Sequence, residues 1–240
     1  MLQSYCNVSS GLYTSLSGAV ANLDQVEVVA NNIANASTTG FRRDQLRFDT
    51  ILGSALPFAS AAAGRVDLSP GTSRLTSNPL NAALDGEGFF VIAGPDGQEL
   101  YTRRGDFRLT PEGVLTLPSG AVVQGGGGPI TVPPGARPEL RADGTVTANG
   151  APVGKLRVVR FESAEGLTKA GESAIAADPA SPPQDVESPR LAVGFVEESN
   201  VDLSSELVNL ILAQRSFEAS MNSLRINDEL TQSLIQQSQR

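Results

Sequence analysis

The stretch Ala30–Phe41, ANNIANASTTGF, ends a long segment of periodic apolar residues near the start of the chain. These residues recur at alternating steps of four and three: Leu12, Leu16, Ala19, Leu23, Val26, Ala30 and Ile33. Such spacing is typical of the narrow apolar seam that one helix presents to another in a coiled coil. It predicts a helix from a cap at Ser9 or Ser10 to about Asn35, with no regular structure in residues 1–9 and Gly40 ending the segment.

The asparagines of this stretch are poor helix-interior residues, because their amides compete for local backbone groups. Asn31, Asn32 and Asn35 therefore indicate side-chain hydrogen bonds across a contact, with a fraying helix end as the equal alternative. The next segment, residues 41–52, is expected to be either a short extended arm or a second helical turn.

A second seam with the same steps lies at the far end of the chain. Its members are Leu203, Leu207, Leu210, Gln214, Phe217, Met221 and Leu224. A cap at Ser199 or Asn200 would start this helix, which we expect to continue to about Gln236.

Each seam needs a partner, because an isolated helix of this length is marginal in water. Burial of its apolar side chains, at roughly 1.5–3 kcal/mol each, would stabilise it only against another helix. The two helices are therefore expected to pair with each other, with neighbouring copies, or both; a helical hairpin packed on its own β domain is the alternative. The expected assembly interface comprises Leu12, Leu16, Leu23, Val26, Ile33, Asn32, Asn35, Leu203, Leu207, Leu210, Phe217, Met221 and Leu224.

The region between the helices has the features of a β domain. Short apolar runs are separated by turns rich in the chain's 24 glycines and 15 prolines. The expected strands are residues 88–92, 100–103, 107–109, 114–117, 121–124, 130–132, 139–141, 145–148, 156–161 and 191–196. Close spacing with tight turns favours an antiparallel meander or a barrel-like sandwich over βαβ units.

These elements predict an α+β fold, in which long N- and C-terminal heptad helices form a coiled-coil stalk and the centre is an all-β, antiparallel, barrel- or sandwich-like domain. The expected divisions are an N-terminal assembly helix and arm (1–45), a linker or extended connector (46–84), the central β domain (85–197) and a C-terminal assembly helix (198–240).

Composition excludes several classes of site. The net charge of −8 disfavours a nucleic-acid partner, which requires a basic face. The absence of histidine and the single cysteine, Cys6, exclude histidine-based triads and cysteine or histidine zinc clusters. No apolar run reaches the ~20 residues that span a membrane, so direct membrane insertion is not expected. The opening residues lack the pattern of a cleaved signal peptide.

Candidate chemical motifs have simpler explanations. The glycines at 125–128 and the run from Gly150 to Lys155 lack the helix that a phosphate loop must open. The acid pairs Asp85/Glu87 and Glu197/Glu198 are of the kind that a glycosidase uses, but turns and caps explain them equally. We therefore expect no enzyme, no catalytic residues, no metal and no cofactor.

The quoted stretches resemble a known family. ANNIANASTTGF, after a heptad helix, is similar to the N-terminal signature of the flagellar rod and hook proteins, and SNVDLSSELVNLILAQRSFEA (199–219) resembles their C-terminal signature. DGEGFFVI (85–92), YTRRGDFRLTPEGVL (101–115) and GPITVPPGA (128–136) are similar to the β domain of the rod members. Within the family, the chain is most similar to proximal-rod members, with the distal rod as runner-up.

The resemblance implies a structural subunit of the basal-body rod, which crosses the periplasm. Terminal helices would assemble helically, with copies of the chain and other rod proteins, around an export channel, and the β domain would form an outer shell. It also implies passage through the flagellar type III export apparatus without a cleaved signal. The rival hypothesis is a secreted carbohydrate-binding or carbohydrate-processing β protein with coiled-coil oligomerisation ends.

Overall fold

The computed structural model describes residues 2–53, 56–171 and 173–238, and the side chains within 16–46, 64–171, 173–230, 232–233 and 236. The chain divides into two compact units. Unit 1 comprises Met1–Ala34, Asp44–Gly64 and Asp202–Arg240, and unit 2 comprises Asn35–Arg43 and Arg65–Val201. The chain therefore passes between the units four times.

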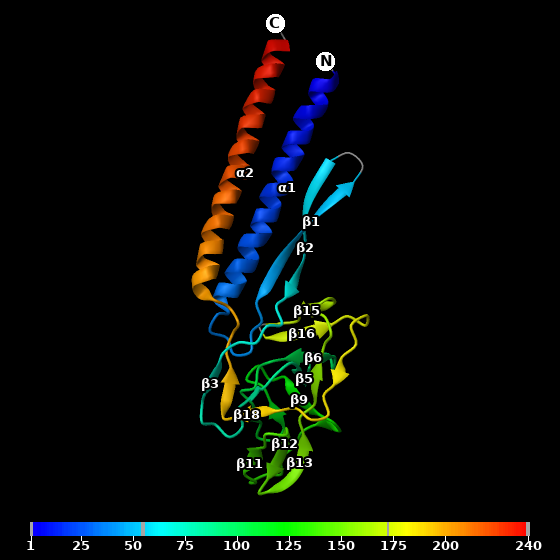
Figure 1. The fold of residues 1–240 in the computed structure, drawn as a ribbon, viewed down its shortest axis with the longest axis vertical. Helices are drawn as coiled ribbons and strands as arrows, with labels where there is room; N and C mark the ends of the chain where they lie inside the picture. Colours follow the sequence, from blue (N-terminus) through cyan, green and yellow to red (C-terminus); the bar gives the residue numbers. More distant parts are fainter. Residues whose placement is uncertain (1, 54–55, 172, 239–240) are drawn as a thin grey trace. The chain divides into compact units, whose positions relative to one another are not determined.

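Unit 1 is built on the two terminal helices. Helix α1 spans Leu2–Ala34 and helix α2 spans Leu203–Ser238. They lie side by side and antiparallel, so that the start of α1 and the end of α2 lie together (Figure 1). Strands β1 (Asp44–Gly53) and β2 (Leu56–Val66) form a two-stranded sheet. In the described part of the chain, neither helix combines the length and apolarity of a membrane crossing.

Both helices begin away from their predicted caps. Helix α1 starts at Leu2, so the expectations of a cap at Ser9 or Ser10 and of irregular residues 1–9 are wrong. An existing helix gains one hydrogen bond per added residue, and polar residues can therefore extend it. Helix α2 is capped by Asp202: its Oδ1 accepts a hydrogen bond from the Ser204 amide (3.0 Å), and its carbonyl accepts one from the Glu206 amide (3.0 Å).

The segment expected to be a linker or extended connector, residues 46–84, contains regular structure. It contains most of β1, all of β2, and the strands β3 (Ser73–Leu75) and β4 (Ala82–Leu84). The linker interpretation is wrong for residues 56–66 in particular. Their alanine-rich composition is a weak strand signal, but a neighbouring strand satisfies their backbone groups whatever the side chains are. Of the two alternatives for residues 41–52, the extended one is confirmed from Asp44 onward.

Unit 2 contains the remaining strands. They are β5 (Phe89–Ala93), β6 (Glu99–Thr102), β7 (Arg108–Leu109), β8 (Leu115–Thr116), β9 (Val122–Gly125), β10 (Gly128–Pro129), β11 (Pro138–Leu140), β12 (Thr145–Ala148), β13 (Ala151–Lys155), β14 (Val158–Arg160), β15 (Leu167–Lys169), β16 (Ala174–Ala177), β17 (Gln184–Asp185), β18 (Leu191–Val193) and β19 (Phe195–Glu197).

The largest sheet follows the order β15-β16-β6-β5-β9-β8-β7, and β14 also pairs with β5. Every pairing with a described register is antiparallel, for example Phe90 opposite Thr102 between β5 and β6. Smaller sheets join β11-β12-β13, β18-β4 and β19-β3. The α+β class and the antiparallel sheet are confirmed, but no barrel closes in the described structure, and that part of the prediction is wrong. Short strands that branch at β5 do not form the single continuous path that a barrel needs.

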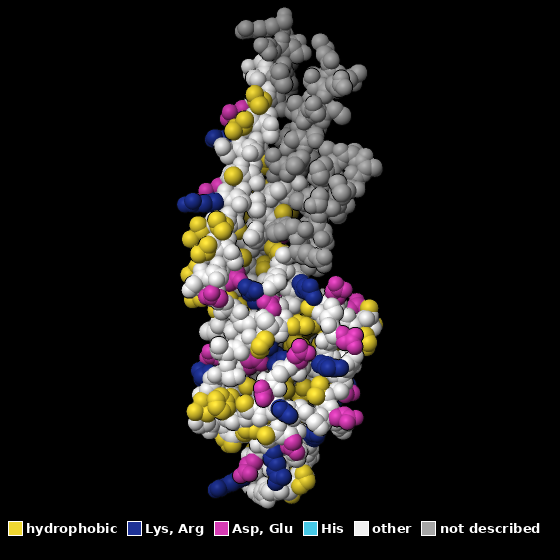
Figure 2. Space-filling model, in the orientation of Figure 1, with side chains coloured by type: hydrophobic (Ala, Val, Ile, Leu, Met, Phe, Trp, Pro, Cys, Tyr) yellow, Lys and Arg dark blue, Asp and Glu magenta, His cyan; other side chains and the backbone are white. Residues whose placement is uncertain are grey.

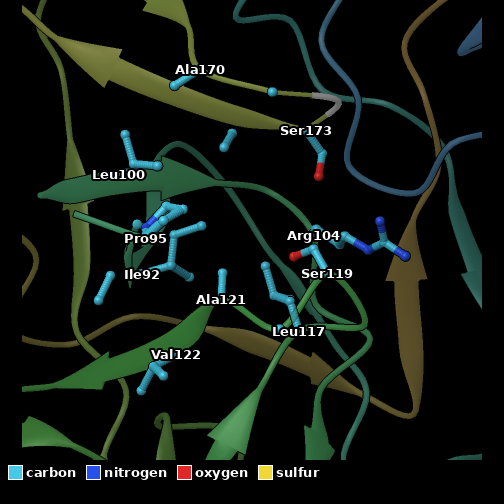
Figure 3. A pocket seen from close by; sticks show the side chains of 15 residues that line it. Ile92, Pro95, Leu100, Arg104, Leu117, Ser119, Ala121, Val122, Ala170 and Ser173 are labelled. Carbon is cyan, nitrogen blue, oxygen red and sulfur yellow. The ribbon is translucent and has the colours of Figure 1, made fainter. Parts of the chain in front are cut away.

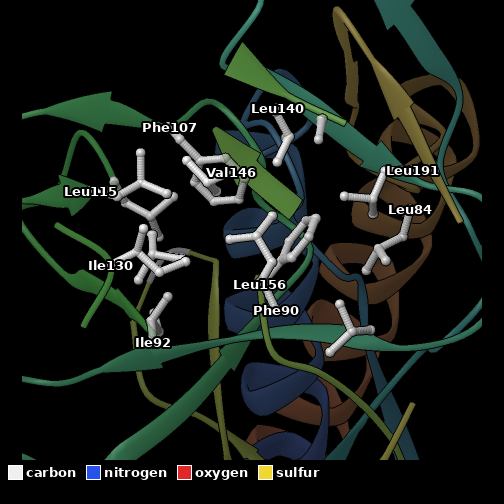
Figure 4. Packing of buried hydrophobic residues seen from close by; sticks show 14 of the residues in the cluster. Leu84, Phe90, Ile92, Phe107, Leu115, Ile130, Leu140, Val146, Leu156 and Leu191 are labelled. Atoms are coloured by element: carbon white, nitrogen blue, oxygen red, sulfur yellow. The ribbon is translucent and has the colours of Figure 1, made fainter. Parts of the chain in front are cut away.

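Strand β5 lies at the centre of unit 2, between two apolar clusters. Phe90 and Ile92 belong to one cluster and Phe89 and Val91 to the other, because successive side chains of a strand point to opposite faces. In the first cluster the ring of Phe90 meets that of Phe107 edge-on, with centroids 5.1 Å apart (Figure 4). Burial on both faces makes this strand the structural centre of the unit.

Candidate assembly surface

The two helices of unit 1 approach each other through small and polar side chains. The Asn22 Nδ2 group donates a hydrogen bond to Ser220 Oγ (3.3 Å). At Gly18, an added Cβ would lie 3.7 Å from the same oxygen. Ala19 and Ala213 are almost fully buried.

The less exposed face of α2 has its own heptad row. Its members are buried or partly buried: Glu206, Leu210, Ala213, Phe217, Ser220, Leu224 and Asn227. Its steps are again four and three, but four of its seven positions are polar or small. Sequence reasoning missed this row because apolar periodicity alone does not include glutamate, serine or asparagine.

Many large apolar side chains of both helices instead lie on the outer faces. Those exposed over 44 % to 56 % of their surface are Leu16, Val20, Leu23, Leu203, Leu207, Val208, Ile211, Leu212, Met221, Ile226 and Leu230. Apolar side chains gather along the visible face of α2 in Figure 2. Large exposed apolar patches are rare on a protein that stays monomeric and mark interaction sites. We call this set the outer apolar surface.

The structure divides the predicted interface residues between the two faces. Leu16, Leu23, Leu203, Leu207 and Met221 are exposed. The partly buried members are Val26, Ile33, Leu210, Phe217 and Leu224. The side chain of Leu12 lies outside the described residues. The predicted seam of α2 therefore spans the boundary between the heptad row on its less exposed face and the outer apolar surface.

The two predicted asparagines have different roles. Asn32 is almost fully buried and exchanges two hydrogen bonds with the backbone of Asp44: its Nδ2 donates to the carbonyl (2.9 Å), and its Oδ1 accepts from the amide (3.0 Å). The side-chain amide of Asn32 thus pairs with the first residue of β1 as a backbone peptide group would. The predicted side-chain hydrogen bonding across a contact is confirmed here, between α1 and β1. Asn35 instead accepts a local hydrogen bond from Thr38 Oγ1 (3.1 Å).

Unit 2 contains a buried ion cluster, which we define as Arg42, Arg103 and Glu197. Glu197 Oε1 lies 2.6 Å from Arg42 Nη2, and its Oε2 lies 3.2 Å from Arg103 Nη1. All three side chains are 2 % exposed. Burial lowers the pKa of Arg103 to about 10, so the guanidinium remains protonated at neutral pH. Sequence reasoning treated Glu197 only as half of an acid pair.

The structure separates the acid pairs that a glycosidase would need. Glu197 is buried among arginines, whereas Glu198 is half exposed and pairs with Arg74 (2.7 Å). Asp85 and Glu87 are exposed. In the part of the chain that the structure describes, no group of three acidic, cysteine or histidine side chains is arranged to hold a metal ion.

Unit 2 also has an open hollow of about 760 Å³ (Figure 3). Its wall is largely apolar, with contributions from Ile92, Leu100, Leu117 and Val122. Among its described lining residues, Arg104 alone is charged, and it pairs with Asp106 (2.7 Å). A hollow lined in this way presents no pair of groups for general acid–base chemistry.

Limited proteolysis is expected to cut unit 1 before unit 2. Both buried apolar clusters lie in unit 2, while α2 exposes most of its large apolar residues. Segments with few buried apolar contacts open most readily. Trypsin should therefore cleave the dilute chain after Arg215 and Arg225 earlier than after Arg141 and Arg160, which are also exposed but lie in unit 2. Mass spectrometry of a time course measures this order, and simultaneous cleavage would contradict the expectation.

Three family models match separate parts of the chain. The flagella basal body rod protein model matches residues 12–42, and the model of the flagellar hook protein FlgE/F/G D1 domain matches residues 83–148. The model of the flagellar basal body rod FlgEFG protein C-terminal region matches residues 192–237. The matched segments include most of α1, strand β5 and nearly all of α2.

Similar proteins cover nearly the whole chain. It is 36% identical to the flagellar basal-body rod protein FlgF of Salmonella typhimurium, over 91% of this chain and 94% of that protein. The corresponding protein of Escherichia coli is 34% identical over the same shares. The flagellar basal-body rod protein FlgG of Bacillus subtilis is 32% identical over 93% of this chain and 97% of its own length.

Proposed function

Because the chain belongs to the flagellar basal-body rod protein family, we propose that its outer apolar surface is the interface through which it assembles with neighbouring rod subunits. The chain is a structural subunit of the rod, in the part of the basal body that spans the periplasm. Its relatives are structural proteins and not enzymes. The carbohydrate hypothesis has no support.

The observation that carries the proposal is the width of the apolar arc on α2. At 3.6 residues per turn, Leu203 and Met221 lie at one edge of the arc, and Leu212 and Leu230 lie roughly 180° away at the other. One packing partner covers an apolar stripe of about 100°. The arc is therefore suited to two neighbours on different sides, which favours a continuing assembly over a closed dimer. Contacts that do not close into a ring generate a helical filament.

The finer parts of the proposal concern the role of each segment. Residues 1–45 and 198–240 would be the assembly segments. Residues 46–84 would be the extended connection from the first of them to the domain 85–197, which would form the outer shell. The heptad row on the less exposed face of α2 supports a coiled coil between the terminal helices. In the assembled rod this coiled coil would line a central channel. The FlgF relatives favour a position in the proximal rod, and the family resemblance favours delivery by the flagellar type III export apparatus.

Deletion of the gene from its chromosome tests the proposal. Cells should lose swimming, and their isolated basal bodies should lack a complete rod in electron micrographs. A plasmid copy of the wild-type gene should restore both, whereas a copy encoding Ile211→Asp, which charges the middle of the apolar arc, should restore neither. Complete rods in the deletion strain would overturn the rod assignment, and complete rods with the Ile211→Asp copy would overturn the proposed interface.

A further inference from the structure

Glu197 is the meeting point of separate backbone segments of unit 2. Its Oε1 accepts a hydrogen bond from the Gly71 amide (2.8 Å) in addition to the one from Arg42. Its own carbonyl accepts a hydrogen bond from the Gly40 amide (2.8 Å). Arg103 reaches the other carboxylate oxygen from the end of β6. One residue thus joins the segments around residues 40–42, 71 and 103.

Two glycines allow these segments to touch backbone to backbone. A Cβ added at Gly71 would lie 2.0 Å from the Glu198 carbonyl oxygen. One added at Gly40 would lie 2.3 Å from the Arg104 backbone nitrogen, and Gly40 also has a φ of +69°. Any side chain at either position would force the segments apart.

Asn200 extends the junction by connecting the same segments. Its Oδ1 accepts a hydrogen bond from the Arg43 amide (2.7 Å). Its Nδ2 donates to the carbonyls of Asp67 (3.2 Å) and Ser69 (3.0 Å). The segments held by Glu197 and Asn200 are residues 40–43, 67–71 and 197–200, each close to a point where the chain enters or leaves unit 2.

The ion cluster is an inefficient way to stabilise this junction. It buries two guanidinium groups against one carboxylate, and Arg42 Nε, Arg42 Nη1 and Arg103 Nε have no hydrogen-bond partner among the described residues. The face of Phe89 lies 5.2 Å from the Arg103 guanidinium and compensates only partly. Replacement of a buried ion triad by apolar residues is often neutral or stabilising.

We propose that the buried ion cluster is a positioning device, which fixes the geometry of these three connecting segments instead of adding stability. Apolar side chains tolerate small slips, whereas a carboxylate shared by two guanidinium groups and a backbone amide accepts one arrangement. The device goes beyond the assembly surface, because it acts within unit 2 on the segments that lead to that surface in the chain.

The test compares an apolar replacement with a matched control. The test variant is Arg42→Met/Arg103→Met/Glu197→Leu, and the control is Arg74→Met/Glu198→Leu, which removes the neighbouring exposed pair. The test variant should melt at or above the wild-type temperature and keep slow amide hydrogen exchange in β5. Its Gly40 amide, which keeps the Glu197 backbone carbonyl as its acceptor, should exchange at least about tenfold faster than in wild type, while that of the control stays unchanged.

A single change tests whether the charges themselves are coupled. Glu197→Gln keeps the shape of the side chain but leaves both arginines without a counter-charge, so it should melt below the triple variant. An equal melting temperature would overturn the proposal. So would unchanged exchange at Gly40 in the triple variant, because apolar packing would then position the segments equally well. Loss of β5 protection there would also overturn it, because the cluster would then serve stability.

A motility assay shows whether the cell depends on the positioning of these segments by the ion cluster. Cells carrying the triple variant at normal protein level should form smaller swarms than cells carrying the control variant, and equal swarms would overturn a functional role for the device. The swarm comparison rests on the proposed function, whereas the hydrogen-exchange measurements do not. Normal swimming in the deletion strain would identify a failure of the rod assignment separately.

Discussion

Replacement of Leu207 by aspartate is expected to abolish swimming without unfolding the free chain. The side chain is 46% exposed on the outer apolar surface, so its loss should change the free energy of unfolding by less than about 0.5 kcal/mol. In the assembled rod the same position would be dry, and an unpaired charge there costs several kcal/mol. Swarm diameter and thermal unfolding of the purified chain measure the two effects.

The matched control is Ser216→Asp. It places the same charge on an exposed position of α2, outside the apolar arc, and adds a residue with the same helix propensity. Cells with this variant should swim normally. Normal swimming of the Leu207→Asp strain, with the protein present at wild-type level, would show that this part of α2 is not an assembly interface.

Replacement of Phe90 by alanine is expected to destabilise unit 2 by roughly 3–5 kcal/mol. Its ring is fully buried at the centre of β5 and packs edge-on against Phe107, so the change leaves a cavity with few ways to collapse. Chemical denaturation followed by circular dichroism gives the change in the free energy of unfolding.

The comparison variant for Phe90→Ala is Asp85→Asn/Glu87→Gln. Both acids are exposed before the same strand, and their change should cost less than about 0.5 kcal/mol and leave swimming intact. If the acids carried a catalytic function, the double amide variant would lose it with little loss of stability. A larger defect in that strain than in the Phe90→Ala strain would contradict the structural role.

Strands bounded by strong turn signals were predictable from the sequence. Strand β12 has the predicted bounds, 145–148, because a turn brackets it at each end. Gly144 adopts a φ of +85°, and Asn149 and Gly150 adopt +51° and +86°, conformations that few other residues take without strain. Turn chemistry is local, and a short stretch of sequence therefore reveals it.

Strands whose partners are distant in the chain were not predictable. Strand β16 is a short alanine-rich segment that pairs with β6, with Ile175 opposite Tyr101. Nothing in its own residues favours a strand over a loop. Its backbone is extended because β15 and β6 supply hydrogen bonds on its two sides, and the β6 partner follows from the topology.

The same limit applies to the candidate site. The leucines of the outer surface were visible as a periodic pattern, but which half of them faces the partner helix depends on where Asn22 and Ser220 meet. Glu197 and Arg42 are 155 positions apart in sequence, and no spacing rule connects them. Long-range polar contacts of this kind require the fold before they can be recognised.

The antiparallel pairing of α1 and α2 determines when the helix pair can form during synthesis of the chain. Asn22 and Ser220 are 198 positions apart, and all of unit 2 except residues 35–43 lies between β2 and α2 in the chain. Contacts of such large sequence separation form late, because the closure of a long loop precedes them. A chain that is still being synthesised therefore contains all of unit 2 before it contains α2. The proposed interface on both helices is complete only after α2 has been added.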